Sequence, residues 1–225
     1  MGILQDITWP QAKEEIEQTR TALIPVGATE QHGYHMPMGS DSYCAFEVAK
    51  RTVEKESAVV VPVVPFGISH CHMSFSGTIT LTCETMARVI REICESLFRH
   101  GVEKFIFING HGHNGPTIAT AIDEFKKDKN VHMFVIPWWI AGGKLTKELW
   151  DFSNGNLPDG HAADIEASGM LAINKDLVDM SKAGSVILEK LPGTNLKFHK
   201  STVVTLEGYP VELATISNFE QFTDT

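Results

Sequence analysis

"TALIPVGATEQHG", residues 21–33, is the stretch that most strongly indicates the fold. An apolar run leads to Gly27, and a carboxylate and an imidazole follow it at Glu30 and His32. A continuous apolar run bounded by glycine is typical of a strand that is buried on both faces, as in a parallel sheet. We therefore expect a strand over residues 21–28 with polar groups directly after its carboxyl end.

The same pattern recurs along the chain. Further apolar runs at 58–67, 104–110 and 131–139 predict three more strands. Alternation of buried strands with helical segments indicates an α/β fold whose mostly parallel sheet is covered on both faces. A weaker edge strand is expected around "GYPVEL", residues 208–213. Helical spacing of apolar residues predicts helices over 42–56, 83–101, 115–130 and 161–174.

Composition limits the classes of function. The chain has 225 residues, of which 43% are hydrophobic, and we expect a single domain over residues 1–225. A net charge of -9 without a basic run disfavours nucleic-acid binding. The apolar runs are too short and too broken by proline to span a bilayer, and the first twenty residues do not resemble a secretory leader. We therefore expect a cytoplasmic protein without a membrane partner.

Histidine-rich loops follow the predicted strands. "GATEQHG" follows the first strand, "PFGISHCHMSFSGT" ends the second and "NGHGHNG" ends the third. The carboxyl ends of parallel strands meet at one edge of a sheet, where the working groups of such folds gather. We therefore expect all of these loops to open onto the same rim.

The first loop has the composition of a metal site. Glu30 and His32 can face one point because residues two apart in an extended segment point the same way. Glycines and prolines that follow can bring Asp41 back to them. Carboxylates with imidazole and no thiolate suit zinc, manganese or iron(II). The alternative for this loop alone is a polar surface segment with an incidental histidine.

Two further segments add donors. His111 and His113 lie in a glycine loop directly after a buried strand, and His161 and Glu166 lie at the start of a predicted helix. A histidine after a strand is often a hydrogen-bonded structural residue, so that interpretation remains open for each alone. Together the segments supply three carboxylates and two or three imidazoles, enough for two metal ions with one bridging carboxylate. His161 remains available to move protons to a leaving nitrogen.

Four ordered segments resemble motifs of the creatininase (creatinine amidohydrolase) family. "PVGATEQHGYHMPMGSD" resembles P-V-G-S-T-E-Q-H-G-P-H-L-P-L-x-T-D, and "FINGHGHN" is similar to N-G-H-G-G-N. "FSGTITL" is similar to F-P-G-T-x-S-L, and "HAADIEAS" resembles H-A-G-E-x-E-T-S. The motifs extend from residue 25 to residue 168 and leave the C-terminal segment unsupported.

The resemblance implies a three-layer α/β/α fold, a homohexamer and two divalent metal ions per subunit. Zinc, manganese and iron(II) all fit the ligand set. The resemblance also implies catalytic roles for His161, as the acid or base, and for Glu166. Carried over by position, one ion would be held by Glu30, Asp41 and His111, and the other by His32, Asp41 and Glu166.

Departures from the motifs argue against creatininase proper. His113 stands where creatininase has a glutamate, and Gly112 stands where it has a tyrosine that contacts substrate. Leu157 and Pro158 replace a Trp-Asp pair. The groups that grip creatinine are therefore missing. The candidates for substrate binding in this chain are Ser69, His72 and His113.

The leading hypothesis is a dinuclear metal-dependent hydrolase in which metal-bound hydroxide attacks a small amide, cyclic amide or formamide and cleaves its C–N bond. One alternative keeps the metal ions but opens a cyclic polyol ketone of the inosose type at a C–C bond. Another is a catalytically silent metal-binding scaffold. Metal analysis, a substrate screen and product analysis separate the three.

Overall fold

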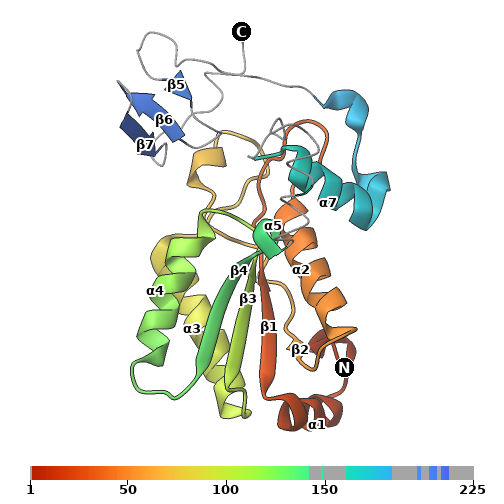
Figure 1. Cartoon of the computed structure of the whole chain (residues 1–225), viewed down its shortest axis with the longest axis vertical. Helices are drawn as coiled ribbons and strands as arrows, with labels where there is room; N and C mark the ends of the chain where they lie inside the picture. The colour runs from red at the N-terminus through yellow and green to blue at the C-terminus, as the bar shows by residue number, and fades with distance from the viewer. Residues whose placement is uncertain are drawn as a thin grey trace.

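The computed structural model describes residues 2–141, 148 and 161–183, and the backbone of three short strands between 197 and 212. Its centre is a parallel sheet in the order β2-β1-β3-β4 (Figure 1). Residues 21–26 pair with 104–109, which pair in turn with 132–137. The predicted parallel α/β sheet is therefore confirmed. Its strands are β1 (Thr21–Val26), β2 (Val59–Val60), β3 (Lys104–Asn109) and β4 (His132–Pro137).

Helices cover both faces of the sheet. In Figure 1, α3 and α4 lie on one side, and α2 lies on the other with α7 beyond its amino-terminal end. The helices are α1 (Trp9–Thr19), α2 (Ser40–Val53), α3 (Cys83–Arg99), α4 (Asn114–Lys126), α5 (Trp138–Ala141) and α7 (Asp164–Asn174). Short 3-10 turns lie at Leu4–Asp6, His70–His72, Lys175–Leu177 and Met180–Lys182.

Successive side chains of β1 pack alternately against the helices on the two faces of the sheet. Ala22 and Ile24 belong to the core cluster that includes Ile90 of α3 and Ile118 of α4. Leu23, between them, belongs to the cluster with the alanines of α2. Successive residues of a strand point to opposite faces, so both faces of β1 are buried. That burial explains why the strand is apolar without interruption.

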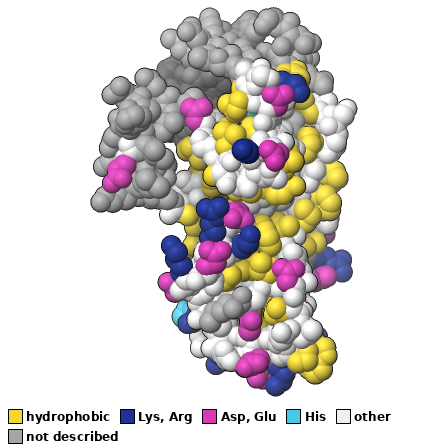
Figure 2. All heavy atoms as spheres, turned by 90° about the vertical axis from the view of Figure 1, so that its right-hand side faces the viewer, with side chains coloured by type: hydrophobic (Ala, Val, Ile, Leu, Met, Phe, Trp, Pro, Cys, Tyr) yellow, Lys and Arg dark blue, Asp and Glu magenta, His cyan; other side chains and the backbone are white. Residues whose placement is uncertain are grey.

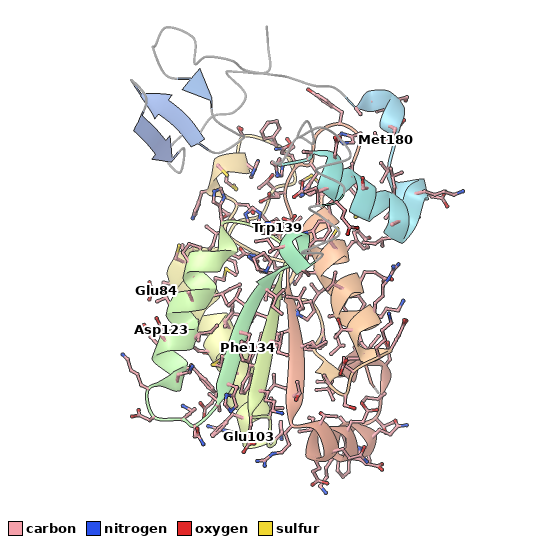
Figure 3. The ribbon with its side chains drawn as sticks, in the orientation of Figure 1. Glu84, Glu103, Asp123, Phe134, Trp139 and Met180 are labelled. Atoms are coloured by element: carbon pink, nitrogen blue, oxygen red, sulfur yellow. The ribbon has the colours of Figure 1, made fainter. Side chains whose placement is uncertain are left out.

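Two strands are shorter than the sequence predicts. Within 58–67, only Val59–Val60 forms a ladder with β1, and Val64 adds an isolated bridge. Pro62 and Pro65 interrupt the rest because proline has no N–H to donate. At the other edge β4 ends at Pro137, and the two tryptophans that follow begin α5. Figure 3 labels Phe134 on β4 and Trp139 just beyond the end of that strand.

Helix α1 was not among the predicted elements. Its start nevertheless carries a signal: Thr8 and Gln11 form a capping box, and Pro10 occupies the first turn. A capping box satisfies N–H groups that have no partner inside the helix. The predicted helices at 42–56, 83–101, 115–130 and 161–174 correspond to α2, α3, α4 and α7.

The C-terminal strands form their own antiparallel sheet in the order β5-β6-β7. They are β5 (Lys197–Phe198), β6 (Val203–Leu206) and β7 (Tyr209–Glu212), and β7 is the edge strand expected around 208–213. Leu157 and Pro158, which depart from the family motif, lie outside the described residues.

The surface beside α2 and α7 mixes charges of both signs. Figure 2 shows Lys and Arg interspersed with Asp and Glu among hydrophobic side chains on this face. Of the helices in the described part of the chain, none combines the length and apolarity that crossing a bilayer requires.

Candidate metal centre

The first donor loop, residues 27–41, folds back on itself after β1. The Glu30 N–H donates to the Met38 carbonyl at 3.0 Å, and Gly33 lies in the intervening turn with a φ of 66°. This left-handed conformation suits glycine because it has no Cβ to clash. The chain then enters α2, whose first turn contains Asp41. The turn thus returns Asp41 to the ring of His32, 3.1 Å from Nε2 to Oδ1.

The second donor loop packs directly against the first. A Cβ on Gly110 would lie 2.3 Å from the Asp41 carbonyl oxygen, so only glycine allows this approach of the two backbones. His111 follows at once, and its N–H donates to Asn109 Oδ1 at 3.2 Å. The end of β3 and the start of α2 therefore hold His111 and Asp41 side by side.

Carboxylates and imidazoles from three segments converge. The Nδ1 atom of His111 lies 3.2 Å from Glu30 Oε1 and 3.3 Å from Asp41 Oδ2. The Nε2 atom of His32 lies 3.8 Å from Glu166 Oε2, in the first turn of α7. Asp41 therefore turns one oxygen toward each of these two imidazoles.

One set of donors coincides with a ligand set expected from the resemblance, and a second set contains two of the three residues expected for the other ion. In each set one ligand atom per residue lies within 4.8 Å of the others. The first set matches the residues carried over for one ion, whereas the second contains His161 beside the two donors of the other ion. The sets are Glu30, Asp41 and His111, and His32, His161 and Glu166. A third set of the same compactness joins Glu30, His72 and His161.

Backbone carbonyls orient the first two imidazoles. The Nε2 atom of His111 lies 2.9 Å from the Ile68 carbonyl oxygen, and Nδ1 of His32 lies 3.1 Å from the Glu30 carbonyl oxygen. A carbonyl only accepts, so each of these nitrogens carries its proton. The remaining nitrogen of each ring faces the carboxylates and can hold a proton or a metal ion. Metal-binding histidines are commonly fixed by such a bond on the far side of the ring.

His161 is oriented in the same way. Its Nε2 atom hydrogen-bonds the Gln31 carbonyl oxygen, and its Nδ1 atom lies 3.5 Å from Glu30 Oε1. Its ring lies between those of His32 and His72, with centroids 4.5 and 4.3 Å away. The structure therefore brings His161 within reach of both carboxylate-rich sets.

The charges in the cluster compensate one another. Burial alone would lower the pKa of His32, but Asp41 and the other carboxylates outweigh it and raise that pKa to about 9. Burial likewise opposes the shift of His111, whose pKa is raised well above the ordinary value by Asp41 and Glu30. Burial would raise the pKa of Asp41, yet His32 and His111 hold it well below its usual range. Without a metal ion, protons on the imidazoles take the place of the positive charge.

The pKa values of the outer members of the cluster shift for a different reason, which is burial. Burial raises the pKa of Glu166 to about 7, although the charge of His32 opposes it. Burial, followed by the charges of His32 and His72, lowers the pKa of His161 to about 3. Burial is also the main reason that the pKa of His72 is lowered. His72 and His161 are therefore neutral near pH 7.

Buried oxygens without partners test whether the site fits a cation. Glu30 and His32 are 0% exposed and Asp41 is 2% exposed, so water does not solvate these carboxylates. Among the described residues, both carboxylate oxygens of Glu30 and the Oδ2 atom of Asp41 make no hydrogen bond. Imidazole nitrogens lie 3.2–3.5 Å from Glu30 Oε1 and Asp41 Oδ2, so these two oxygens are ion-paired without a hydrogen bond. Burying a charged oxygen without hydrogen bonds is costly. A divalent cation would satisfy them, and the donors present fit zinc, manganese or iron(II).

The predicted substrate residues border this cluster. Ser69 is fully buried, its Oγ atom has no hydrogen-bond partner among the described residues, and its N–H donates to Thr80 Oγ1 at 2.9 Å. His72 lies with Nε2 3.5 Å from Glu30 Oε1. His113 packs edge-on against His111 at 5.3 Å and lies 3.5 Å from the Cys71 sulfur. His72 and His113 thus lie beside donors of the first set, whereas Ser69 directly follows Ile68, whose carbonyl oxygen holds His111.

Sequence reasoning missed two polar residues that support the site. Asn114 accepts from the Ile68 N–H at 3.0 Å and donates to the Gly27 carbonyl at 3.0 Å, which ties together the loops after β1 and β2. Gln31 contacts His72. Asn114 could be noticed in the sequence, because it is a polar residue at the start of a predicted helix, where such residues commonly act as caps. Gln31 carried none beyond its position between two donors.

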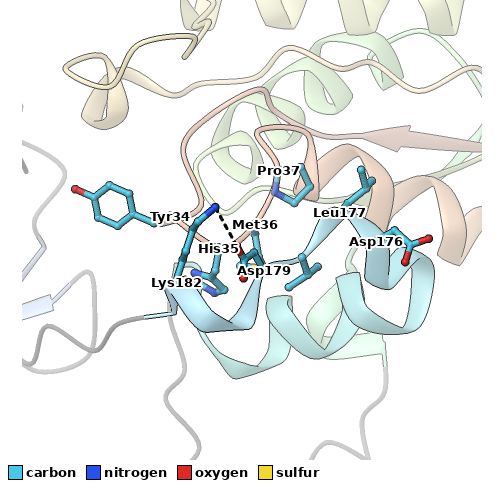
Figure 4. A pocket seen from close by; sticks show the side chains of 9 residues that line it. Tyr34, His35, Met36, Pro37, Asp176, Leu177, Asp179 and Lys182 are labelled. Carbon is cyan, nitrogen blue, oxygen red and sulfur yellow. Dashed lines mark ion pairs between the residues drawn. The ribbon is translucent and has the colours of Figure 1, made fainter.

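A separate hollow of about 250 Å³ lies beside the 3-10 turns after α7 (Figure 4). Lys182 pairs with Asp179 at 2.9 Å within it, so that carboxylate is already compensated. None of the donors described above lines it, and the candidate chemistry stays with the buried cluster. Its described lining includes Tyr34, His35, Met36, Leu177, Asp179 and Lys182.

These features define an α/β protein with a buried centre of carboxylates and imidazoles at the carboxyl end of a parallel sheet. Residues 5–209 match the family described as creatininase, creatinine amidohydrolase. The chain belongs to the creatininase family.

Relatives and solved structures agree with this assignment. The chain is 28% identical over 198 residues to creatinine amidohydrolase of Pseudomonas putida, covering 79% of this chain and 74% of that protein. It is 28% identical to 3-dehydro-scyllo-inosose hydrolase of Thermotoga maritima, covering 75% and 55%. It is also 28% identical to a mycofactocin precursor peptide peptidase of Mycobacterium ulcerans, covering 82% and 68%. These relatives are hydrolases that act on different substrates, so the family indicates hydrolysis without fixing the substrate.

Solved creatininases share the fold. A manganese creatininase superposes with a TM-score of 0.77 at 26% identity and covers 85% of this chain and 80% of its own. A mutant creatininase of Zn–Zn type gives 0.74 at 26% identity, with the same coverage. The three-layer expectation is therefore confirmed. The distance from creatininase in sequence agrees with the view that this chain is not creatininase proper.

Proposed function

We propose that this protein is a metal-dependent hydrolase that cleaves the C–N bond of a small amide, cyclic amide or formamide. One observation carries the proposal. Buried carboxylate oxygens without hydrogen bonds face ring nitrogens whose opposite nitrogens are held by backbone carbonyls. This arrangement suits cations that need several converging donors.

Two divalent ions are proposed, with Asp41 shared between them because its two oxygens point to different imidazoles. When bound, such ions would polarise a carbonyl and lower the pKa of a water molecule to near neutrality. The residues that would hold them are Glu30, Asp41 and His111 for one ion, and His32, Asp41 and Glu166 for the other.

His161 is proposed to move the proton. Its Nε2 atom is held at the Gln31 carbonyl oxygen, so the Nδ1 atom of the neutral ring carries a lone pair. That lone pair can first accept a proton from the attacking water. Its Nδ1 atom faces Glu30, which places the accepting nitrogen inside the cluster. It can then deliver that proton to the departing nitrogen, which leaves as a neutral amine. Glu166 is proposed to take part by holding the second ion beside His161.

The test combines metal analysis with a substrate panel. Protein purified without added metal is analysed for zinc, manganese and iron, reloaded, and assayed against lactams, cyclic ureides and formamides. Asp41→Asn should lose bound metal and turnover together, whereas Glu47→Gln on the same helix should keep both. An Asp41→Asn protein that retains its full metal content and activity overturns the proposal.

A second candidate cleaves a C–C bond in a cyclic polyol ketone. The similarity to 3-dehydro-scyllo-inosose hydrolase over 75% of this chain favours including it. Product analysis separates the two, since the first releases an amine or formate and the second a ring-opened acid. A protein that loads metal but turns over neither class would be a metal-binding scaffold.

A further inference from the structure

His72 differs in orientation from the other imidazoles of the centre. His32, His111 and His161 each have one ring nitrogen at a backbone carbonyl, which leaves the other free to face the carboxylates. The Nδ1 atom of His72 instead lies 2.9 Å from the Nε2 atom of the Gln31 side chain. The Nδ1 atom of this ring therefore faces an amide group, whose polarity decides which nitrogen of neutral His72 carries the proton.

The orientation of the Gln31 amide is fixed by a second contact. The Gly33 N–H donates to the Oε1 atom of Gln31 at 2.8 Å. An N–H can only donate, so the group facing Gly33 must be the amide oxygen and the group facing His72 must be the NH₂. The NH₂ also only donates, and Nδ1 of His72 must accept. Neutral His72 therefore carries its proton on Nε2.

That N–H is directed into the donor cluster. The Nε2 atom of His72 lies 3.5 Å from Glu30 Oε1, and the His72 ring lies 4.3 Å from the ring of His161. His72 is buried, so its N–H is shielded from bulk water. A hydrogen-bond donor held in place before the reaction is most useful where negative charge develops.

We propose that His72 is a catalytic hydrogen-bond donor to the carbonyl oxygen of the substrate, and that Gln31 is the positioning residue that sets its tautomer. As water adds to the carbonyl carbon, the C=O electron pair moves onto oxygen, and the Nε2–H of His72 stabilises that charge without transferring its proton. The inference rests on the proposed function, because it requires a carbonyl substrate.

The geometry argues against the alternative that His72 is a metal ligand. Glu30, His72 and His161 are close enough together to hold an ion. Coordination through Nε2 would move the proton of neutral His72 to Nδ1, where it would meet the NH₂ of Gln31. Two donors would then face each other at 2.9 Å. The three imidazoles held by carbonyls meet no such conflict.

The first experiment reads the tautomer directly. ¹⁵N-histidine NMR is recorded on the metal-free protein and after zinc is added, with His72→Gln to assign the signal. We expect an unprotonated Nδ1 and a protonated Nε2 in both states, and protonation of Nδ1 in Gln31→Glu, whose carboxylate accepts. A protonated Nδ1 in the unmodified protein, or loss of the Nε2 proton when zinc binds, overturns the proposal.

The second experiment measures zinc binding and turnover separately. His72→Phe should bind zinc as the parent protein does, while its kcat on the amide found by the panel falls roughly 10²–10³-fold with little change in KM. His72→Gln keeps an N–H donor and should recover part of that loss. His70→Phe is the matched control because His70 belongs to the same 3-10 turn but is exposed, and it should change neither quantity.

The outcomes distinguish this inference from the proposed function. Loss of zinc from His72→Phe would make His72 a ligand, and undiminished turnover would remove its catalytic role; either result leaves the proposed function standing. A zinc-loaded parent protein that hydrolyses no amide overturns the proposed function and the role of His72 with it, whatever the NMR shows.

Discussion

At the scale of single residues, His161 has two possible roles in the cluster, and a single substitution can distinguish them. It lies within ligand distance of Glu30 and of the His32–Glu166 set, yet it is proposed to move protons. A ligand and a proton carrier respond differently to removal, because only the ligand contributes to holding the ion.

His161→Ala should therefore keep its metal and lose about 10²–10⁴-fold in kcat, the usual value of acid–base assistance. Metal content is measured by elemental analysis and kcat on the same preparation. The exposed His100 provides the control, and His100→Ala should alter neither. If His161→Ala loses half of its metal, the residue is a ligand.

The raised pKa of His32 predicts that metal binding releases protons. Below about pH 9 the nitrogen that faces Asp41 is protonated in the metal-free protein, and an ion must displace that proton. Zinc affinity should therefore rise with pH up to about pH 9, where His32 loses its proton. Calorimetry in buffers of different ionisation enthalpy counts the protons. His32→Gln should release about one fewer, and a pH-independent affinity would contradict the prediction.

The residue contacts also show what the sequence could not reveal. Glu30, His32 and Asp41 could be grouped because they share one short loop. The acceptors that orient the rings are the carbonyls of Ile68, Gln31 and Glu30, and every residue type has a carbonyl. Their positions depend on the folded path of the backbone, so residue identity alone carries no trace of them.

At the scale of elements, the junction between β3 and α2 determines where the donors lie. Gly110 touches the backbone of Asp41, so its lack of a side chain sets the distance between the two donor loops. Backbone atoms cannot rotate out of the way as the end of a flexible side chain can. The effect of adding a methyl group should therefore be large here and small elsewhere in the same loop.

Gly110→Ala should lower the free energy of unfolding by about 1–3 kcal/mol, the usual cost of overpacking, and should weaken zinc binding. Gly112→Ala is a matched control from the same loop, because a Cβ there meets nothing within 4 Å. Chemical denaturation of the metal-free proteins measures the difference. Equal stability of the two variants would show that the junction adjusts freely.

Helices and strands were predictable from the sequence where a single local pattern determined them. β1 and β3 followed from uninterrupted apolar runs, and α3 from apolar spacing up to Gly101. The strand predicted over 58–67 is longer than the observed β2, because Pro62 and Pro65 interrupt the apolar run. Helix α1 was overlooked because Ile16 is its only buried residue, so it has almost no apolar stripe.

At the scale of the whole molecule, the assembly remains a prediction. The family resemblance implies a homohexamer of the 24.8 kDa chain. On the edge strand β4, Phe134 and Ile136 are 55% and 36% exposed, and exposed apolar edge strands tend to be covered by a partner. We expect sedimentation or light scattering to give a mass six times that of one chain. A monomer at micromolar concentration would contradict this.

The order of the donors along the chain has a consequence for how the protein is made. Glu30, Asp41 and His111 belong to the loop after β1, to α2 and to the loop after β3, whereas His161 and Glu166 come from beyond residue 160. On a translating ribosome, the first three emerge while the last two have yet to be synthesised. A nascent chain would thus be able to capture one ion early in its biogenesis and gain its second only at maturation, so that loading occurs in sequence.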